Sequence, residues 1–379
     1  MADWYGLRSD VEWMIRRVSW AELEELEDYE RMKVESCEQS IFTTIKARGS
    51  ISFNGCDPPD EIDPIRLYYC FTDADSKRVK EPVATFLAEA SNPAFSSLEG
   101  GTTRESGTVD CYSLLKVLSD ASLKRPLTVP AGTNAVAYAV AAVESFGLRT
   151  NNPDKSSYLL SSDHTFEATD SHLDMVNWLL DAAGFASATT DALGTVQIVK
   201  YVEPTERPVS WVFDNGDRSI MYPKVSTESD WRSIPNVYTA IYQTDEESLA
   251  VTVRNVDQNS KASLPNRGWR ENSLTEAVSE LAGDTVQKRL ANLEAMAKKN
   301  LAGKSAEVEY VKFSCAYVPV KLNDAVMIEY SDRRWSGSVT DVRTSGDAQG
   351  KTDLEVRRFV RHDLKVEVES QIVYQKGVV

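Results

Sequence analysis

The sequence predicts an α+β fold in which β-rich regions alternate with smaller helical regions. Apolar and polar residues alternate in two-residue steps at 45–53 and 325–330, a pattern typical of half-buried strands. Apolar residues at helical spacing occur at 133–146 and 273–301, each after a strand-rich stretch. The order of a β-rich and then a helical region thus occurs twice, with no active-site pattern in between. This organisation indicates a building block rather than a catalyst.

The length of 379 residues is enough for several domains, each with its own core. Pro204 and Pro208 mark a boundary, and a polar linker with Pro265 precedes the longest helix. The predicted parts are a first β domain at 1–120, a mixed α/β domain at 121–207, a second β domain made of 208–262 and 306–379, and a helical segment at 263–305.

An acidic segment at 19–30 opens the first β domain. Ser19 and Glu22 have the spacing of a capping box, which would begin a short helix. A solvated surface turn is the simpler interpretation. The sharper alternative is an acidic rim that faces a lumen or a basic partner.

The rest of the first β domain alternates in strand fashion up to about residue 90. Residues 83–90 fit a strand or a short helix, and the Gly- and Ser-rich stretch 91–107 predicts an exposed loop. A helix is expected after Asp110, because Tyr112, Leu115 and Leu118 have helical spacing. The strands are predicted at 32–38, 45–53 and 65–71, with a turn at 54–55.

The mixed domain combines short strands with two helices. Thr133 is expected to cap a helix that ends at Gly147, and a second helix is expected from about Ser171 to Ala183, before Gly184. The remaining elements are a strand at 127–130 and a hairpin of 185–188 with 195–201 across a turn at 191–194.

The second β domain surrounds the longest predicted helix. Ser273 and Glu276 form a capping-box pattern at its start, and Gly283 weakens it. The tail, 363–379, alternates at 364–368. We expect strands 306–313 and 364–368 to pair with neighbouring subunits. The other strands are predicted at 211–213, 225–229, 237–242, 249–253, 325–330, 335–343 and 354–360.

The net charge of −16 argues against a protein that grips nucleic acid, because phosphate contacts need clustered Lys and Arg. It is compatible with DNA that passes close by without sticking, and equally with solubility alone. No stretch of about 18 apolar residues predicts a membrane span, and the N-terminus lacks a signal-peptide pattern. The five cysteines are odd in number, lack CxxC spacing, and are interpreted as small buried hydrophobes.

One stretch gathers potential metal ligands, but its residues also suit helix capping. No nucleophile elbow, P-loop, dinucleotide fingerprint or HExxH motif is present. We therefore expect no catalytic, cofactor-binding or metal-binding residues. The ligand-rich stretch contains Asp163, His164, Glu167, Asp170, His172 and Asp174.

Two other function classes stay open from the residues alone. A glycoside or cell-wall hydrolase would need two acidic side chains that converge in a cleft. Because Asp and Glu are abundant here, the sequence does not indicate which two residues would form such a pair. A receptor- or carbohydrate-binding module would use the exposed loop 91–107 and nearby aromatic residues, although aromatics on strands are usually core or interface residues. The candidates for such a sugar site are Trp211, Trp231, Trp269 and Trp335.

Four stretches, taken in order, resemble the tail hub proteins of tailed bacteriophages, which are found in baseplates and tail tips. The order carries the likeness, since each motif alone is weak. The stretches are 44–55 with the strand 65–71, 110–118 with 129–133 and its helix, 234–238 after the strand at 225, and 318–328 after the long helix.

The resemblance implies two tail-tube-like antiparallel β-barrel domains, interleaved with the smaller helical or mixed domains. It implies a homotrimeric ring in the virion that adapts a six-fold tail tube to a three-fold tip. Implied partners are a distal tail or tail tube protein, the tape-measure protein and a central spike or tip protein. DNA would pass through the channel without specific binding. No enzyme activity, cofactor or membrane insertion is implied, and the chain would be made in the host cytoplasm. The acidic N-terminal segment has no match in the pattern.

Overall fold

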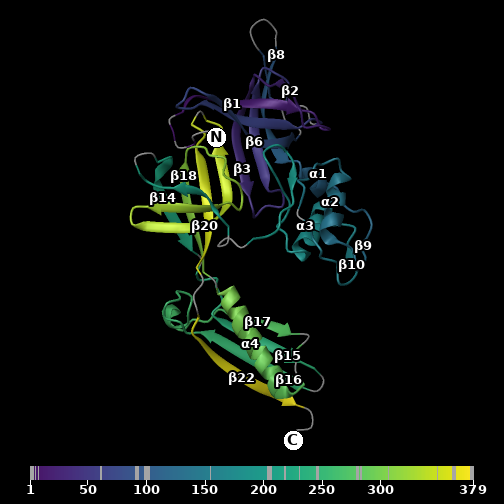
Figure 1. Ribbon diagram of the computed structural model, residues 1–379, viewed down its shortest axis with the longest axis vertical. Coiled ribbons are helices and arrows are strands. Elements are labelled where there is room, and N and C mark those ends of the chain that lie inside the picture. The colour runs from purple at the N-terminus through teal and green to yellow at the C-terminus, as the bar shows by residue number, and fades with distance from the viewer. Residues whose placement is uncertain are drawn as a thin grey trace. The chain divides into compact units, whose positions relative to one another are not determined.

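The computed structural model describes residues 4, 6, 8–59, 62–89, 94–97, 103–153, 155–202, 207–216, 219–229, 231–244, 247–278, 281, 284–305, 307–347, 349–360 and 364–375. The chain forms two compact units (Figure 1). Unit 1 consists of residues 1–225 and 312–356, and unit 2 consists of residues 226–311 and 357–379. Within the described ranges, no helix is long and apolar enough to cross a membrane.

A first set of antiparallel strands begins unit 1, hydrogen-bonded in the order β2-β1-β5-β6-β8-β4-β3. Every residue of β5 from Ile65 to Phe71 is buried, as expected for an interior strand that pairs with β1 and β6. The strands are β1 (Ser9–Val18), β2 (Glu25–Asp28), β3 (Met32–Ser40), β4 (Ala47–Asn54), β5 (Ile65–Thr72), β6 (Arg78–Ala88), β7 (Ala94–Ser97) and β8 (Thr103–Ser113).

A second set of strands continues the same sheet, because β3 also pairs with β20. Its order is β14-β18-β21-β20, and β19 pairs with β20 and with the parallel strand β13. Figure 1 labels β14, β18 and β20 of this set. No closed barrel is found among the described strands. The strands are β13 (Val209–Phe213), β14 (Met221–Ser229), β18 (Glu307–Cys315), β19 (Ala325–Tyr330), β20 (Arg333–Ser345) and β21 (Thr352–Val360).

The structure corrects several local expectations for the first set. Residues 19–28 form a turn and β2 rather than a helix, since Ser19 accepts a hydrogen bond from the Leu23 amide and the chain then pairs with β1. The stretch 83–88 is part of strand β6. The expected loop at 91–107 contains β7 and the start of β8, while 91–93 and 98–102 lie outside the described residues.

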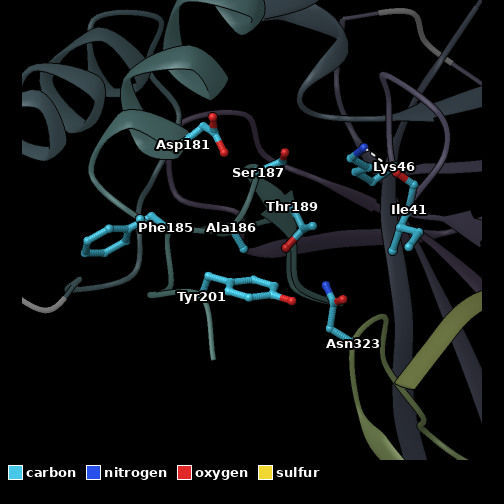
Figure 2. Close-up of a pocket in the computed structure, with 10 residues that line it drawn as sticks. Ile41, Lys46, Asp181, Phe185, Ala186, Ser187, Thr189, Tyr201 and Asn323 are labelled. Carbon is cyan, nitrogen blue, oxygen red and sulfur yellow. Dashed lines mark hydrogen bonds between the residues drawn. The ribbon is translucent and has the colours of Figure 1, made fainter. Parts of the chain in front are cut away.

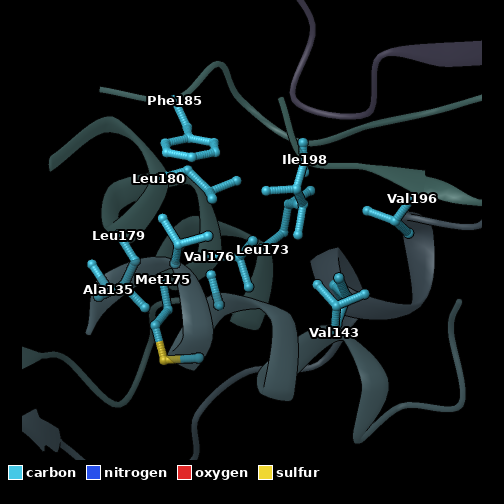
Figure 3. Packing of buried hydrophobic residues seen from close by; sticks show 14 of the residues in the cluster. Ala135, Val143, Leu173, Met175, Val176, Leu179, Leu180, Phe185, Val196 and Ile198 are labelled. Carbon is cyan, nitrogen blue, oxygen red and sulfur yellow. The ribbon is translucent and has the colours of Figure 1, made fainter. Parts of the chain in front are cut away.

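A mixed α/β region with its own apolar core completes unit 1. Leu173, Val176 and Leu180 of α3 pack there with Val143 of α2 and with Ile198 (Figure 3). Its elements are α1 (Lys116–Asp120), β9 (Leu127–Val129), α2 (Ala135–Glu144), β10 (His164–Phe166), α3 (His172–Ala182), β11 (Thr189–Thr190) and β12 (Val196–Gln197).

The ends of these helices follow local capping rules. Ser171 and Asp174 form a reciprocal capping box at the start of α3, and Gly184 follows its end with φ +74°, as expected. Asn134, rather than the predicted Thr133, caps α2. The helix expected after Asp110 is short, because residues up to Ser113 belong to β8.

Unit 2 is a four-stranded sheet in the order β17-β15-β16-β22, with helix α4 on one face. Leu293, Ala297 and Leu301 of α4 are fully buried against Leu249 and Val251 of β16. The elements are β15 (Val237–Gln243), β16 (Glu247–Asn255), the 3-10 helix η2 (Pro265–Arg267), β17 (Ser273–Val278), α4 (Val286–Lys304) and β22 (Val366–Gln375).

The predicted start of the long helix at Ser273 is wrong. Residues 273–278 form β17, which pairs in parallel with β15, and α4 begins after Thr285, whose side chain accepts from the Lys288 amide. Leu274, Glu276 and Val278 alternate in two-residue steps, which suits a strand as well as a helix start. Gly283 lies outside the described residues.

Candidate functional site

The two histidines in the stretch predicted to be rich in ligands have structural roles. His164 of β10 stacks on Trp178 of α3, with ring centroids 3.6 Å apart and planes at 15°. His172 lies at the start of α3, and its Nδ1 is 2.8 Å from the carbonyl oxygen of Ala121. Each ring therefore packs the mixed region together rather than facing a shared point.

The acidic residues of the same stretch cap turns and helices. Asp163 accepts from the Ala131 amide at 2.8 Å, and Asp170 accepts from the Glu167 amide at 2.8 Å. Asp174 closes the capping box with Ser171. In the described part of the chain, no group of three or more His, Cys, Asp or Glu residues is placed to hold a metal ion.

The four tryptophans considered as a sugar site are distributed over both units. Trp335 of β20 is only 7% exposed, so its ring is not available as a platform for a sugar. Trp211 belongs to β13 in unit 1. Trp231 and Trp269 lie on connecting segments of unit 2, where Trp269 is 68% exposed.

A cleft in unit 1 lies between the mixed region and the two strand sets. Its first cavity, of about 370 Å³, is lined by Lys46, Asp181, Tyr201 and Asn323, among others (Figure 2). The Lys46 Nζ donates to the Ile41 carbonyl at 2.7 Å, and burial lowers the pKa of this lysine. Lys46 also lines a second cavity of about 440 Å³, so the two cavities adjoin.

The second cavity contains two carboxyl groups with altered acidity. Burial raises the pKa of Glu81, and the charge of Lys321 opposes that shift. Burial also raises the pKa of Asp324, although its carboxylate accepts from the Lys321 amide at 2.9 Å. Cys37 lines the same cavity, but burial raises the pKa of its thiol to about 12, so it stays protonated at neutral pH. The cavity therefore lacks an activated thiolate nucleophile.

Sequence reasoning did not find this cleft. Lys46 precedes β4, Glu81 belongs to β6, and Asp324 immediately precedes β19, so only the tertiary fold brings them to one cavity. None of these residues belongs to a motif with functional spacing. No local signal in the sequence indicates that the three side chains share a site.

Of the two strands expected to pair with neighbouring subunits, one is interior to its own sheet, and the other has an edge that no described strand occupies. Strand β18, expected to pair with a neighbouring subunit, lies between β14 and β21 of its own chain, so both of its edges are occupied. Strand β22 pairs with β16 on one side, and no described strand pairs with its other side. The edge strand β14 contains Pro223 and Lys224, residues that discourage pairing with further strands.

Several carboxylates of the acidic segment pair with basic residues of the same chain. Arg16 pairs with Glu25 and Asp28, and Arg17 pairs with Glu27. The segment thus belongs to an ion-pair network on the first strand set, which accounts for much of its charge.

No protein-family model matches the sequence, and none of the curated proteins does. Solved structures are similar. The tail protein from Neisseria meningitidis MC58 superposes with a TM-score of 0.59 at 12% identity, covering 92% of this chain and 97% of that one. The 43 kDa tail protein of prophage MuSo2 from Shewanella oneidensis gives 0.60 at 12% identity, covering 92% and 98%. A chain of the Francisella PdpA–VgrG complex gives 0.53 at 10% identity, covering 93% of this chain but 54% of that one.

At these identities the likeness is one of fold. It extends over nearly the whole length of the two tail proteins, so it includes the strand sets, the mixed region and the α4-covered sheet together. The resemblance inferred from the sequence is confirmed at this level: the chain has the fold of these two tail proteins.

Proposed function

We propose that this chain is a structural hub protein of a bacteriophage tail, located at the distal end of the tail in the virion. The observation that supports it most is the shared fold with two tail proteins over 92% of this chain and at least 97% of theirs. A likeness that includes every region of both chains favours a shared architectural role over a shared single module.

In the proposed assembly, three copies form a ring. Each copy supplies two tail-tube-like barrels, one from 1–120 and one from 208–262 with 306–379, so the ring presents six similar barrels to a six-fold tube and three-fold symmetry to the tip. The proposed neighbours are a distal tail or tail tube protein, the tape-measure protein and a central spike or tip protein. The predicted boundaries at 1–120, 121–207, 208–262 with 306–379, and 263–305 stay a prediction.

The charge of the chain supports passage of DNA rather than binding. A net charge of −16 repels a polyanion, and binding would need clustered Lys and Arg. Two observations support a non-enzymatic role: Cys37 in the cleft is protonated, and outside the cleft His164 and His172 are engaged in packing.

The test is the mass of the purified chain by multi-angle light scattering, with negative-stain images of the same sample. A particle of three times 42.2 kDa with a central hole is expected. The measurement is repeated with the cognate tail tube protein, which serves as a template for the ring. A chain that forms no ring alone or with this template would contradict the proposal.

A cell-wall clearing assay on the same preparation tests the non-enzymatic role. No clearing is expected from the wild-type chain. A hydrolase would instead be supported if the wild type clears cell walls and a triple substitution of Asp163, His164 and Glu167 abolishes the clearing.

A further inference from the structure

Trp269 in unit 2 has an unusual combination of exposure and backbone conformation. It is 68% exposed, and its φ of +63° follows a φ of +61° at Gly268. A left-handed backbone is rare for a bulky residue, because Cβ approaches the following carbonyl oxygen. The Trp269 amide donates to the Leu264 carbonyl at 2.7 Å, which holds this conformation.

The loop that carries Trp269 is fixed by its own hydrogen bonds. The Asn266 side chain donates to the carbonyls of Gln258 and Ser260, both at 2.8 Å. Leu264 is buried beneath the loop. The indole is therefore presented by an ordered support, which reduces the entropy lost when it contacts a partner.

Two arginines accompany the exposed indole. Arg270 follows Trp269 directly, and the Asn236 side chain donates to the Arg270 carbonyl at 3.0 Å, so 231–236 lies beside 270–272. Arg232 lies on that neighbouring segment, with its guanidinium 5.4 Å from the centre of the Trp231 ring. We call Trp231, Arg232, Trp269 and Arg270 the Trp269 patch.

The charge of the Trp269 patch is not cancelled by the described part of the chain. Arg232 and Arg270 are exposed and make no ion pair there. The neighbouring acid, Glu271, is 3.9 Å from Arg254. Trp and Arg are the residue types most enriched at the energetic centres of protein interfaces.

The acidic excess of the chain is concentrated in the other unit. Unit 2 contains 15 basic and 16 acidic residues, a net charge of −1, whereas unit 1 contains the remaining 27 basic and 42 acidic residues, a net charge of −15. A second copy of this chain thus offers the patch a strongly acidic protein surface. Nucleic acid fits less well, because two arginines on a chain of net charge −16 make a poor polyanion site.

We infer that the Trp269 patch is a self-association surface that binds the acidic unit 1 of a second copy. The inference rests on the proposed function only in that both require more than one copy. Trp269 inserts as the apolar anchor, and Arg232 and Arg270 pair with carboxylates around it. The attraction weakens with added salt, since these charges are exposed.

The first test is sedimentation velocity of the full chain over a range of protein and salt concentrations. Trp269→Ala is expected to weaken self-association at least about 30-fold, as for the loss of a central anchor. Arg270→Glu is expected to weaken it and to reduce its salt dependence, and this second variant leaves the left-handed residue in place. Lys299→Glu, a charge reversal at an exposed residue of unit 2 outside the patch, is the matched control and should change nothing.

The second test places a photo-cross-linking benzoylphenylalanine at position 269 in an equal mixture of ¹⁵N-labelled and unlabelled chains. Cross-links that join a labelled to an unlabelled chain, through acidic peptides of unit 1, support the inference. Cross-links confined to one chain overturn it, as does a wild-type chain that stays monomeric at every concentration.

The two proposals fail in different ways. If Trp269→Ala and Arg270→Glu change neither the mass nor the stability of a three-copy ring, the role inferred for the Trp269 patch is wrong and the proposed ring stands. If the wild type self-associates without forming a three-copy ring, and both variants abolish this association, the role of the Trp269 patch is supported and the proposed ring is contradicted.

Discussion

The guanidinium of Arg66 and the carbonyl of Leu193 are joined by a hydrogen bond of 3.0 Å, although 127 residues separate them in the chain. Arg66, on β5, is only 5% exposed and also donates to the carbonyl of Leu23 and to the hydroxyl of Thr85. No carboxylate pairs with it in the described part of the chain. One buried side chain thus joins the first strand set, the acidic segment and the β11–β12 turn.

Replacing Arg66 with Met is expected to destabilise the chain by about 3 kcal/mol, because the buried Thr85 hydroxyl and two partly buried carbonyls lose their donor at once. Urea denaturation followed by tryptophan fluorescence measures the change. Arg48→Met is the matched control. Its side chain is 62% exposed and pairs with Glu38 on the surface, so a loss below about 1 kcal/mol is expected. Equal effects of the two variants would contradict the role given to Arg66.

Gly194 in the β11–β12 turn is required by both backbone conformation and space. Its φ is +90°, and an added Cβ would lie 3.0 Å from Leu114 Cδ1 and 3.2 Å from Thr85. We expect Gly194→Ala to destabilise unit 1 by about 2 kcal/mol. Gly303, near the end of α4, has no atom within 4 Å of its ideal Cβ, so Gly303→Ala should stabilise by about 0.5 kcal/mol. Thermal unfolding of both variants checks the opposite signs.

Glu25 links the stability of the first strand set to pH. Burial by itself raises the pKa of this carboxyl, but hydrogen bonds from Lys80, Tyr68 and Arg16 outweigh it and lower the pKa from 4.5 to about 2. Since the folded pKa lies below the unfolded one, the stabilisation is present above pH 4.5 and is lost as the pH falls towards 2.

The melting temperature of wild type and of Glu25→Gln, measured at steps across this pH range, tests the linkage. The wild type should be more stable at neutral pH, and the difference should shrink as the acid is titrated. Glu24→Gln, at an exposed neighbour, is the control. If the difference in melting temperature between wild type and Glu25→Gln does not change with pH, the charge of the Glu25 carboxylate does not contribute to stability.

The cysteines should differ sharply in reactivity. Cys37, Cys70, Cys111 and Cys315 are buried, and burial raises the pKa of Cys37 and Cys111 to about 12. Cys56 is partly exposed. We expect Ellman's reagent at neutral pH to titrate one thiol in the native chain and all five in denaturant, with Cys56→Ser abolishing the native reaction. Rapid labelling of a second thiol in the native chain would contradict the burial of the other four cysteines.

Local signals in the sequence determined the elements whose ends are set by neighbouring residues. Ser171 and Asp174 predict the start of α3, and Gly184 predicts its end, because a capping box and a left-handed glycine act within one helical turn. The predicted turn at 191–194 is also present, with Asp191 accepting from the amides of Leu193 and Thr195. The strand β11 that pairs across it is 189–190 rather than 185–188, although Phe185 bridges Lys200 as the predicted hairpin requires. The ordered likeness to phage tail proteins was also inferred from the sequence, and the fold shared with two tail proteins confirms it at the level of fold.

Tertiary structure decided what depends on partners distant in the chain. Ser273 and Glu276 have the same capping spacing as Ser171 and Asp174, yet they lie in β17, because pairing with β15 satisfies the backbone there. Strand β18 is interior for a similar reason, since β14 and β21 occupy both of its edges. The cleft around Lys46 and the contact of Arg66 with Leu193 each join segments that no local pattern connects. Capping acts over a few residues and is visible in sequence, whereas strand pairing and burial are chosen among many distant partners only as the chain folds.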